Sequence, residues 1–176
     1  MYINKDNLSK AFENLEKNKS LNTIPSWEQL PAIELYMDQV IILLNQYVNT
    51  STPITQSMIN NYVKLKAIPA PVKKRYSKIH LAYLIIFCTL KQTLSISTIQ
   101  KIMPVDLTGE QVIKVYHAFI EYRQKALEYA SDKLKEISVN EETDNIVMQI
   151  SSIANVFKML TEDITWDEET KESEKK

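Results

Sequence analysis

The sequence predicts a mainly α-helical protein, and two observations support this class. The 176-residue chain has one glycine, Gly109, so it offers few of the positive-φ turns that a many-stranded antiparallel sheet requires. Apolar residues recur at helical spacing in several segments, and a serine or threonine stands at the N-cap position of some of them. Apolar residues make up 44% of the chain, which is enough for a core.

The first predicted elements are short. Apolar residues at helical spacing indicate a peripheral helix over residues 6–19. Ser26 and Gln29 have the spacing of a capping box, which predicts a turn that stops at Pro31. A stronger helix is predicted over residues 33–48.

A cluster of short helices follows. Thr55 suits the N-cap of a helix over residues 56–66, which the next prolines end. Ser77 opens a helix from residue 78 to about 92, and a further short helix ends before Pro104. The segment between the first two of these helices has room only for a small extended excursion.

The last third of the chain predicts two longer helices. Thr108 and Gln111 form a capping box, and apolar periodicity continues from there to about Ile137. A second apolar stripe follows over residues 146–164. Two amphipathic helices joined by a short polar break predict an antiparallel hairpin.

Charge is segregated along the chain. Between Asp38 and Asp106 lie 67 residues without a carboxylate, and they contain eight lysines and arginines, six of them from Lys64 to Lys78. Residues 1–38 carry six acids against four bases, and residues 106–176 carry sixteen against nine. A run without carboxylates can approach phosphates without local repulsion, so this basic middle segment predicts a polyanionic partner.

Composition argues against several classes of function. A single glycine excludes glycine-rich phosphate loops, and the single cysteine, Cys88, allows neither an intramolecular disulfide nor a thiol-based metal cluster. His80 and His117 lack partners at metal-ligand spacing, and no catalytic triad or carboxylate pair can be nominated. We therefore expect no enzyme, no metal and no cofactor.

The location expected from the sequence is the cytoplasm. The N-terminal residues lack the apolar stretch and cleavage site of a signal peptide. The longest apolar run, Leu81 to Leu90, has ten residues, about half of what a membrane-spanning helix needs. We expect it to be a helix buried on most sides.

The middle segment resembles the winged helix-turn-helix of MerR-type regulators. Its residues 58–64, Met-Ile-Asn-Asn-Tyr-Val-Lys, stand where that family has its recognition helix, and residues 74–77, Lys-Arg-Tyr-Ser, resemble the closing residues of the wing. The chain departs from the family at Asn60, where MerR proteins have an arginine, and in a wing that is short and lacks glycine. Residues 24–103 are more closely similar to an uncharacterised family of Gram-positive bacterial proteins known only as a domain of unknown function.

The sequence patterns and the resemblance together imply four parts. Residues 1–25 form the peripheral helix and loop, and residues 26–104 form a winged helix-turn-helix-like DNA-binding domain with a very short wing. Residues 105–165 form the C-terminal helical hairpin, for dimerisation or as a scaffold. Residues 166–176 form a disordered acidic tail.

The chemistry of a DNA site is present in the basic segment. A helix N-terminus can hold a phosphate, asparagines can read an adenine edge, lysines and arginine can contact phosphates, and tyrosine hydroxyls on a half-buried ring can reach a partner. The candidate DNA-binding residues are Thr55, Gln56, Ser57, Asn60, Asn61, Tyr62, Lys64, Lys66, Lys73, Lys74, Arg75, Tyr76 and Lys78.

The expected function is therefore that of a cytoplasmic MerR-like transcriptional regulator that binds duplex DNA and forms a homodimer through residues 109–164, without contact to a membrane. The alternative is an all-helical protein-interaction module or anti-repressor whose basic surface binds an acidic protein. A small effector pocket between the hairpin and the winged domain, lined by residues such as Tyr116, Phe119 and Phe157, is left open.

Overall fold

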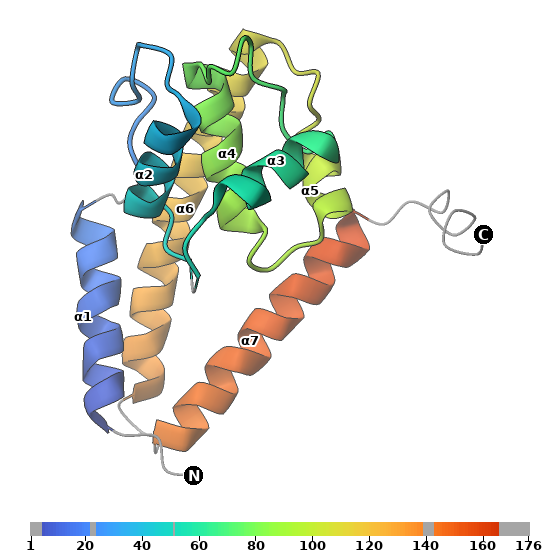
Figure 1. The fold of residues 1–176 in the computed structure, drawn as a ribbon. Coiled ribbons are helices and arrows are strands. Elements are labelled where there is room, and N and C mark those ends of the chain that lie inside the picture. The colour runs from blue at the N-terminus through green and yellow to red at the C-terminus, as the bar shows by residue number, and fades with distance from the viewer. Residues whose placement is uncertain (1–4, 22–23, 51, 139–142, 166–176) are drawn as a thin grey trace.

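Helices account for most of the chain (Figure 1). The computed structural model describes residues 5–21, 24–50, 52–138 and 143–165, and in this part of the chain only isolated β-bridges accompany the helices. The predicted mainly α class is confirmed. The helices are α1 (Lys5–Leu21), α2 (Met37–Tyr47), α3 (Gln56–Lys64), α4 (Lys78–Leu90), α5 (Ile96–Ile102), α6 (Gly109–Ser138) and α7 (Thr143–Ile164).

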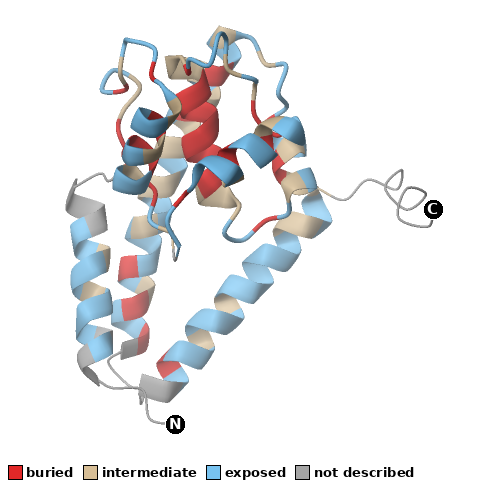
Figure 2. Cartoon of the chain, in the orientation of Figure 1, coloured by how far each residue is buried: buried red, intermediate tan, exposed pale blue. Residues whose placement is uncertain are grey.

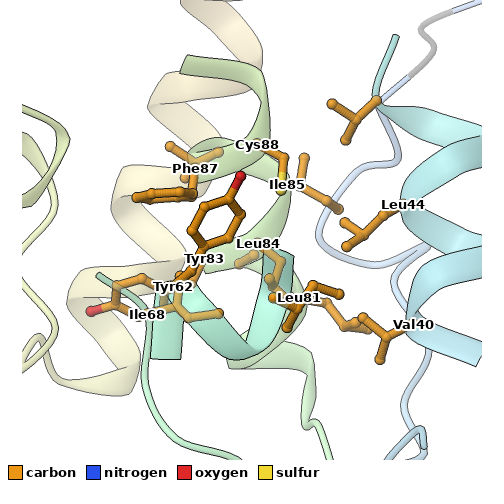
Figure 3. Packing of buried hydrophobic residues seen from close by; sticks show 14 of the residues in the cluster. Val40, Leu44, Tyr62, Ile68, Leu81, Tyr83, Leu84, Ile85, Phe87 and Cys88 are labelled. Carbon is orange, nitrogen blue, oxygen red and sulfur yellow. The ribbon is translucent and has the colours of Figure 1, made fainter. Parts of the chain in front are cut away.

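The core is built around α4. Every residue of this helix from His80 to Cys88 is buried, as Figure 2 shows by its continuous red ribbon. A helix that is apolar all round is typical of a protein interior, and the predicted buried helix is confirmed. Val40 and Leu44 of α2 pack against α4 from one side (Figure 3), while α6 covers another face.

The apolar stripe of α6 packs into two separate clusters of the chain. Its first half, with Val112 and Tyr116, belongs to the core around α4. Its second half, with Leu134 and Ile137, forms a smaller cluster with α1 and the start of α7. The peripheral helix predicted over residues 6–19 is confirmed as α1, which packs along α6.

The start of α2 differs from the prediction of a helix over residues 33–48. The helix begins at Met37, because Leu35 exchanges two backbone hydrogen bonds of 2.9 Å with Tyr76. The N–H of Tyr36 then donates to the side-chain oxygen of Gln39 at 2.9 Å, which caps the helix. A long-range backbone pairing thus replaces the first predicted turn, and local spacing carries no sign of such a pairing.

The connection between α2 and α3 is held by one asparagine. The side chain of Asn45 donates to the backbone oxygen of Ile54 at 3.0 Å and accepts from its N–H at 2.8 Å. Gln92, just after α4, donates to the backbone oxygen of Asn49 at 2.9 Å. These contacts position α3 although the loop is longer than a tight turn.

The predicted hairpin of α6 and α7 is closed only near its connection. Ile146 is buried against Leu134 and Ile137, but from there α7 runs away from α6 (Figure 1). At its far end, the backbone oxygen of Thr165 accepts from the Lys101 ammonium of α5 at 2.8 Å. The acidic tail predicted over residues 166–176 lies outside the described residues. No helix in the described part is long and apolar enough to cross a bilayer.

Candidate functional site

The exposed face of α3 gathers most of the residues predicted to read DNA. The hydroxyl of Thr55 accepts from the N–H of Met58 at 3.4 Å, so the predicted N-cap is confirmed. Ile59 and Tyr62 face the core, and at about 100° per residue the opposite side of the helix is polar. The exposed residues on that side are Gln56, Ser57, Asn60, Asn61 and Lys64.

The cap that follows the C-terminal end of α3 contains a lysine in a left-handed conformation. Lys66 has φ 53°, and the N–H of Ala67 donates to the backbone oxygen of Tyr62 at 2.9 Å. This is the geometry of a Schellman cap, where glycine is usual. From α5, the side chain of Gln100 donates to the carbonyl oxygens of Leu65 and Lys66, at 3.0 and 3.2 Å. Lys66 is thereby fixed at the helix end, although its backbone would favour glycine.

The extended excursion after α3 forms a two-residue hairpin. Val72 and Arg75 exchange two backbone hydrogen bonds of 2.9 and 3.1 Å, and between them Lys73 and Lys74 have φ 49° and 64°. Positive φ at both central residues is the pattern of a type I′ turn, which favours Asn-Gly. In the described part of the chain, the non-glycine residues with positive φ are these two lysines and Lys66.

His80 ties the hairpin to α4. Its Nδ1 accepts the N–H of Ser77 at 3.1 Å, which places the ring proton on Nε2, where it donates to the backbone oxygen of Ala70 at 3.0 Å. The ring also meets that of Tyr76 edge to face, with centroids 5.8 Å apart. The sequence suggested no role for His80 other than a metal ligand, although a histidine three residues after a serine N-cap is at the position of a capping partner.

An acid and two aromatic residues of the N-terminal flank approach the basic segment in space. Arg75 lies 3.9 Å from the carboxylate of Glu34 and 5.4 Å from the ring centroid of Tyr36. Lys78 lies 5.0 Å from a ring centroid of Trp27. The segregation of charge along the sequence is therefore partly undone by the fold.

Two of the candidate residues, Tyr62 and Tyr76, are buried, whereas the other candidates are not. Tyr62 packs on Phe87 with ring centroids 4.5 Å apart, and Tyr76 pairs with Leu35. Burial raises the pKa of both phenols, and neither ring is exposed on the surface of the protein. Among residues 64–78, four exposed lysines have no described carboxylate within salt-bridge distance, namely Lys64, Lys66, Lys73 and Lys74. We call these four lysines and the exposed residues of α3 the basic surface.

The effector pocket considered from the sequence does not form from its suggested residues. Tyr116 is buried, and its hydroxyl donates to the backbone oxygen of Pro25 at 2.8 Å. Phe157 instead meets Tyr129, with ring centroids 6.4 Å apart. Tyr129 is 13 residues beyond Tyr116 on the same helix, about 20 Å away at the rise of an α-helix.

Metal and thiol chemistry find no site in the described residues. No group of three histidine, cysteine, aspartate or glutamate side chains comes together there. Cys88 is buried in α4, and burial raises its pKa to about 12, so the thiol stays protonated. A cavity of about 120 Å³ lies beside it, lined in part by Met58, Tyr62 and Lys91.

Comparison with known proteins gives one match. Residues 25–119 match a family described as a domain of unknown function (DUF1836). This range contains helices α2 to α5, the first part of α6 and the whole basic surface. No curated protein and no solved structure matches the chain.

Proposed function

The chain belongs to the DUF1836 family, and from its own surface we propose that it binds duplex DNA as a transcriptional regulator in the cytoplasm. In this proposal α2, α3 and the hairpin over residues 72–75 act as a winged helix-turn-helix with a very short wing, resembling that of MerR-type proteins. Helix α3 enters the major groove, and the hairpin lies along the phosphate backbone.

The observation that carries the proposal is the backbone conformation of three lysines. Lys66, Lys73 and Lys74 adopt positive φ, which costs about 1 kcal/mol per residue relative to glycine. Residues held in such conformations cluster at functional sites, where the side chain is worth more than the backbone cost. Three cations in glycine positions, none paired with a carboxylate in the described chain, fit a phosphate-binding surface.

Helix α3 supplies groups that suit base and phosphate contacts. Its nine residues begin with free backbone N–H groups and the positive end of the helix dipole, next to Gln56 and Ser57. Asn60 and Asn61 are exposed on the same side, and an asparagine can bond both edge atoms of an adenine in the major groove. Lys64 follows one turn later.

The hairpin is rigid enough to hold a defined distance from α3. Ala67 and Ile68, which connect the two, are buried, and His80 binds the backbone of Ala70. Because a rigid surface loses less conformational entropy on binding, this anchoring supports a recognition role.

The test is a salt titration of binding to duplexes selected from a random library. We expect enrichment of a defined sequence and a log-log slope of about −0.9 per phosphate contacted. Asn61→Ala should relax the sequence preference, whereas Lys64→Gln should weaken binding to all duplexes alike. Absence of duplex binding at about 50 mM salt would reject the proposal. A partner captured from lysate in a nuclease-resistant manner would favour the alternative, an acidic protein.

A further inference from the structure

Helix α7 carries the sequence pattern of a coiled-coil seam. Apolar residues alternate at spacings of four and three, which is the a and d pattern of heptads. Of these residues only Ile146 is buried, and the exposed fractions of Ile150, Phe157, Leu160 and Ile164 are 42%, 54%, 48% and 83%. We call the set the α7 seam, and it consists of Ile146, Ile150, Ile153, Phe157, Leu160 and Ile164.

The described part of the chain does not cover this seam beyond its first two turns. The stripe of α6 that would be its natural partner is occupied by α4 and α1. Tyr129 of α6 reaches the ring of Phe157 edge to face, and farther along α7 has moved away from α6 (Figure 1). Figure 2 shows most of α7 as exposed. The seam is a large exposed apolar face, which in a soluble protein usually marks an interface.

The seam also lacks the charges of a solvated helix. Residues 145–157 contain no aspartate, glutamate, lysine or arginine. Depletion of charge is characteristic of the buried centre of protein interfaces. It also argues against nucleic acid or an acidic protein as the occupant, because both would require cations here.

We propose that the α7 seam binds the same seam of a second copy of this chain, with the two helices antiparallel about a two-fold axis level with Asn155. In this register each a position meets a d position of the other copy, as in antiparallel coiled coils. Ile150 then packs against the partner's Leu160, and Ile153 against the partner's Phe157. The spacing of four and three is the same in both directions, so these central layers are apolar on both sides, while Ile146 stays in the cluster of its own chain.

The positions beside the seam explain why the occupant is a second copy. A two-fold interface places each patch against itself, so any charge near the axis would meet its own copy and be repelled. Here Ala154 and Val156 flank the axis, and both are uncharged. The one charged flanking residue, Asp163, lies eight residues from the axis, level with the partner's Val147. The seam is thus self-complementary in its apolar spacing, and the positions that flank it near the axis are uncharged.

Sedimentation equilibrium of the full chain tests the proposal. We expect a dimer for the natural sequence, and Leu160→Lys should raise its dissociation constant by about 30-fold or more, because it buries a charge in an apolar layer. Met148→Lys is the matched control, since Met148 is 70% exposed on the opposite side of α7 and should leave the dimer intact. A natural chain that is monomeric at about 50 μM, or a dimer that Leu160→Lys does not weaken, would overturn the proposal.

Cysteine cross-linking tests the register. The variant Ile150→Cys/Leu160→Cys should form a covalent dimer under mild oxidation, because the two positions meet between copies. Within one chain they are ten residues apart on a helix, about 15 Å, which is too far for a disulfide. Ile150→Cys alone should not cross-link, and a covalent dimer of that single variant would show a parallel pairing and refute the register. Both experiments are independent of DNA binding, so their failure would leave the proposed function standing.

Discussion

Arg75 and Glu34 lie 3.9 Å apart, although the sequence separates them into a basic and an acidic segment. The backbone pairing of Leu35 with Tyr76 brings the two chain segments side by side. Both side chains are about half exposed, so the ion pair contributes little to stability. Its consequence for DNA binding is larger, because Glu34 places a negative charge beside the proposed wing.

Glu34→Gln should therefore strengthen duplex binding. Removing the carboxylate frees Arg75 for a phosphate and removes a local repulsion, which should raise affinity by about threefold at low salt and less at higher salt. Fluorescence anisotropy at several salt concentrations measures this. Glu13→Gln, which removes an exposed acid from α1, is the control. If Glu34→Gln and the natural chain bound DNA with equal affinity, the DNA would not lie beside Glu34 and Arg75.

Replacing Lys73 and Lys74 by asparagine and glycine should separate stability from function. Asn-Gly is the preferred pair for a type I′ turn, so the double variant should be more stable by about 1–2 kcal/mol. The same change removes two cations, so the salt slope of DNA binding should lose about two contacts. Thermal unfolding and salt-titrated binding are the two measurements.

The control for that variant removes two exposed lysines from ordinary helical positions. Lys10→Gln/Lys114→Gln carries the same loss of net charge in α1 and α6, and should leave the salt slope unchanged. If the turn variant were more stable and bound DNA with an unchanged slope, the hairpin would not contact DNA. A more stable protein with weaker binding cannot be explained by misfolding.

His80 should hold the hairpin in place through its second ring nitrogen. His80→Gln keeps an acceptor for the N–H of Ser77 but no longer reaches Ala70, whereas His80→Phe loses both bonds. We expect a loss of about 1 kcal/mol for the glutamine and about 2–3 kcal/mol for the phenylalanine. Amide exchange of Val72 and Arg75 should become faster in both variants. Unchanged exchange in His80→Gln would mean that the hairpin does not depend on this bond.

The positions of most helices could be predicted from the sequence, because the caps and apolar runs that determine them lie within a few residues of each helix. The caps at Thr55 and Ser77 and the unbroken apolar run of α4 act within a few residues, and the structure has these elements at the predicted places. The errors occur where distant segments meet. Leu35 is extended because of Tyr76, and α7 leaves α6 because α1 and α4 already fill the α6 stripe.

The candidate site was predictable in composition but not in geometry. The exposed polar side of α3 follows from helical spacing, since Ile59 and Tyr62 mark the buried side. The left-handed lysines could not be read from the sequence, because only a required turn geometry reveals them. The proximity of Glu34 was hidden for the same reason, since it depends on the long-range backbone pairing of Leu35 with Tyr76.

Tyr116 should make the protein sensitive to alkaline pH. Its buried hydroxyl donates to the backbone oxygen of Pro25, and burial raises the pKa of this phenol well above its ordinary value of about 10. The folded state holds the phenol proton more tightly than the unfolded state does. The contribution of Tyr116 to the free energy of unfolding is therefore fully present below about pH 10. It is lost as the pH rises beyond that value, because the unfolded phenol then ionises.

Tyr116→Phe separates this effect from the hydrogen bond. At neutral pH the variant should be less stable by about 1–2 kcal/mol, because the oxygen of Pro25 loses its donor in a buried place. Above about pH 10 its stability should fall less steeply than that of the natural chain, since one buried phenol no longer ionises on unfolding. Urea unfolding between pH 7 and pH 11 measures both. Parallel stability curves for the two proteins would show that the alkaline loss comes from the other buried phenols, Tyr62, Tyr76 and Tyr83.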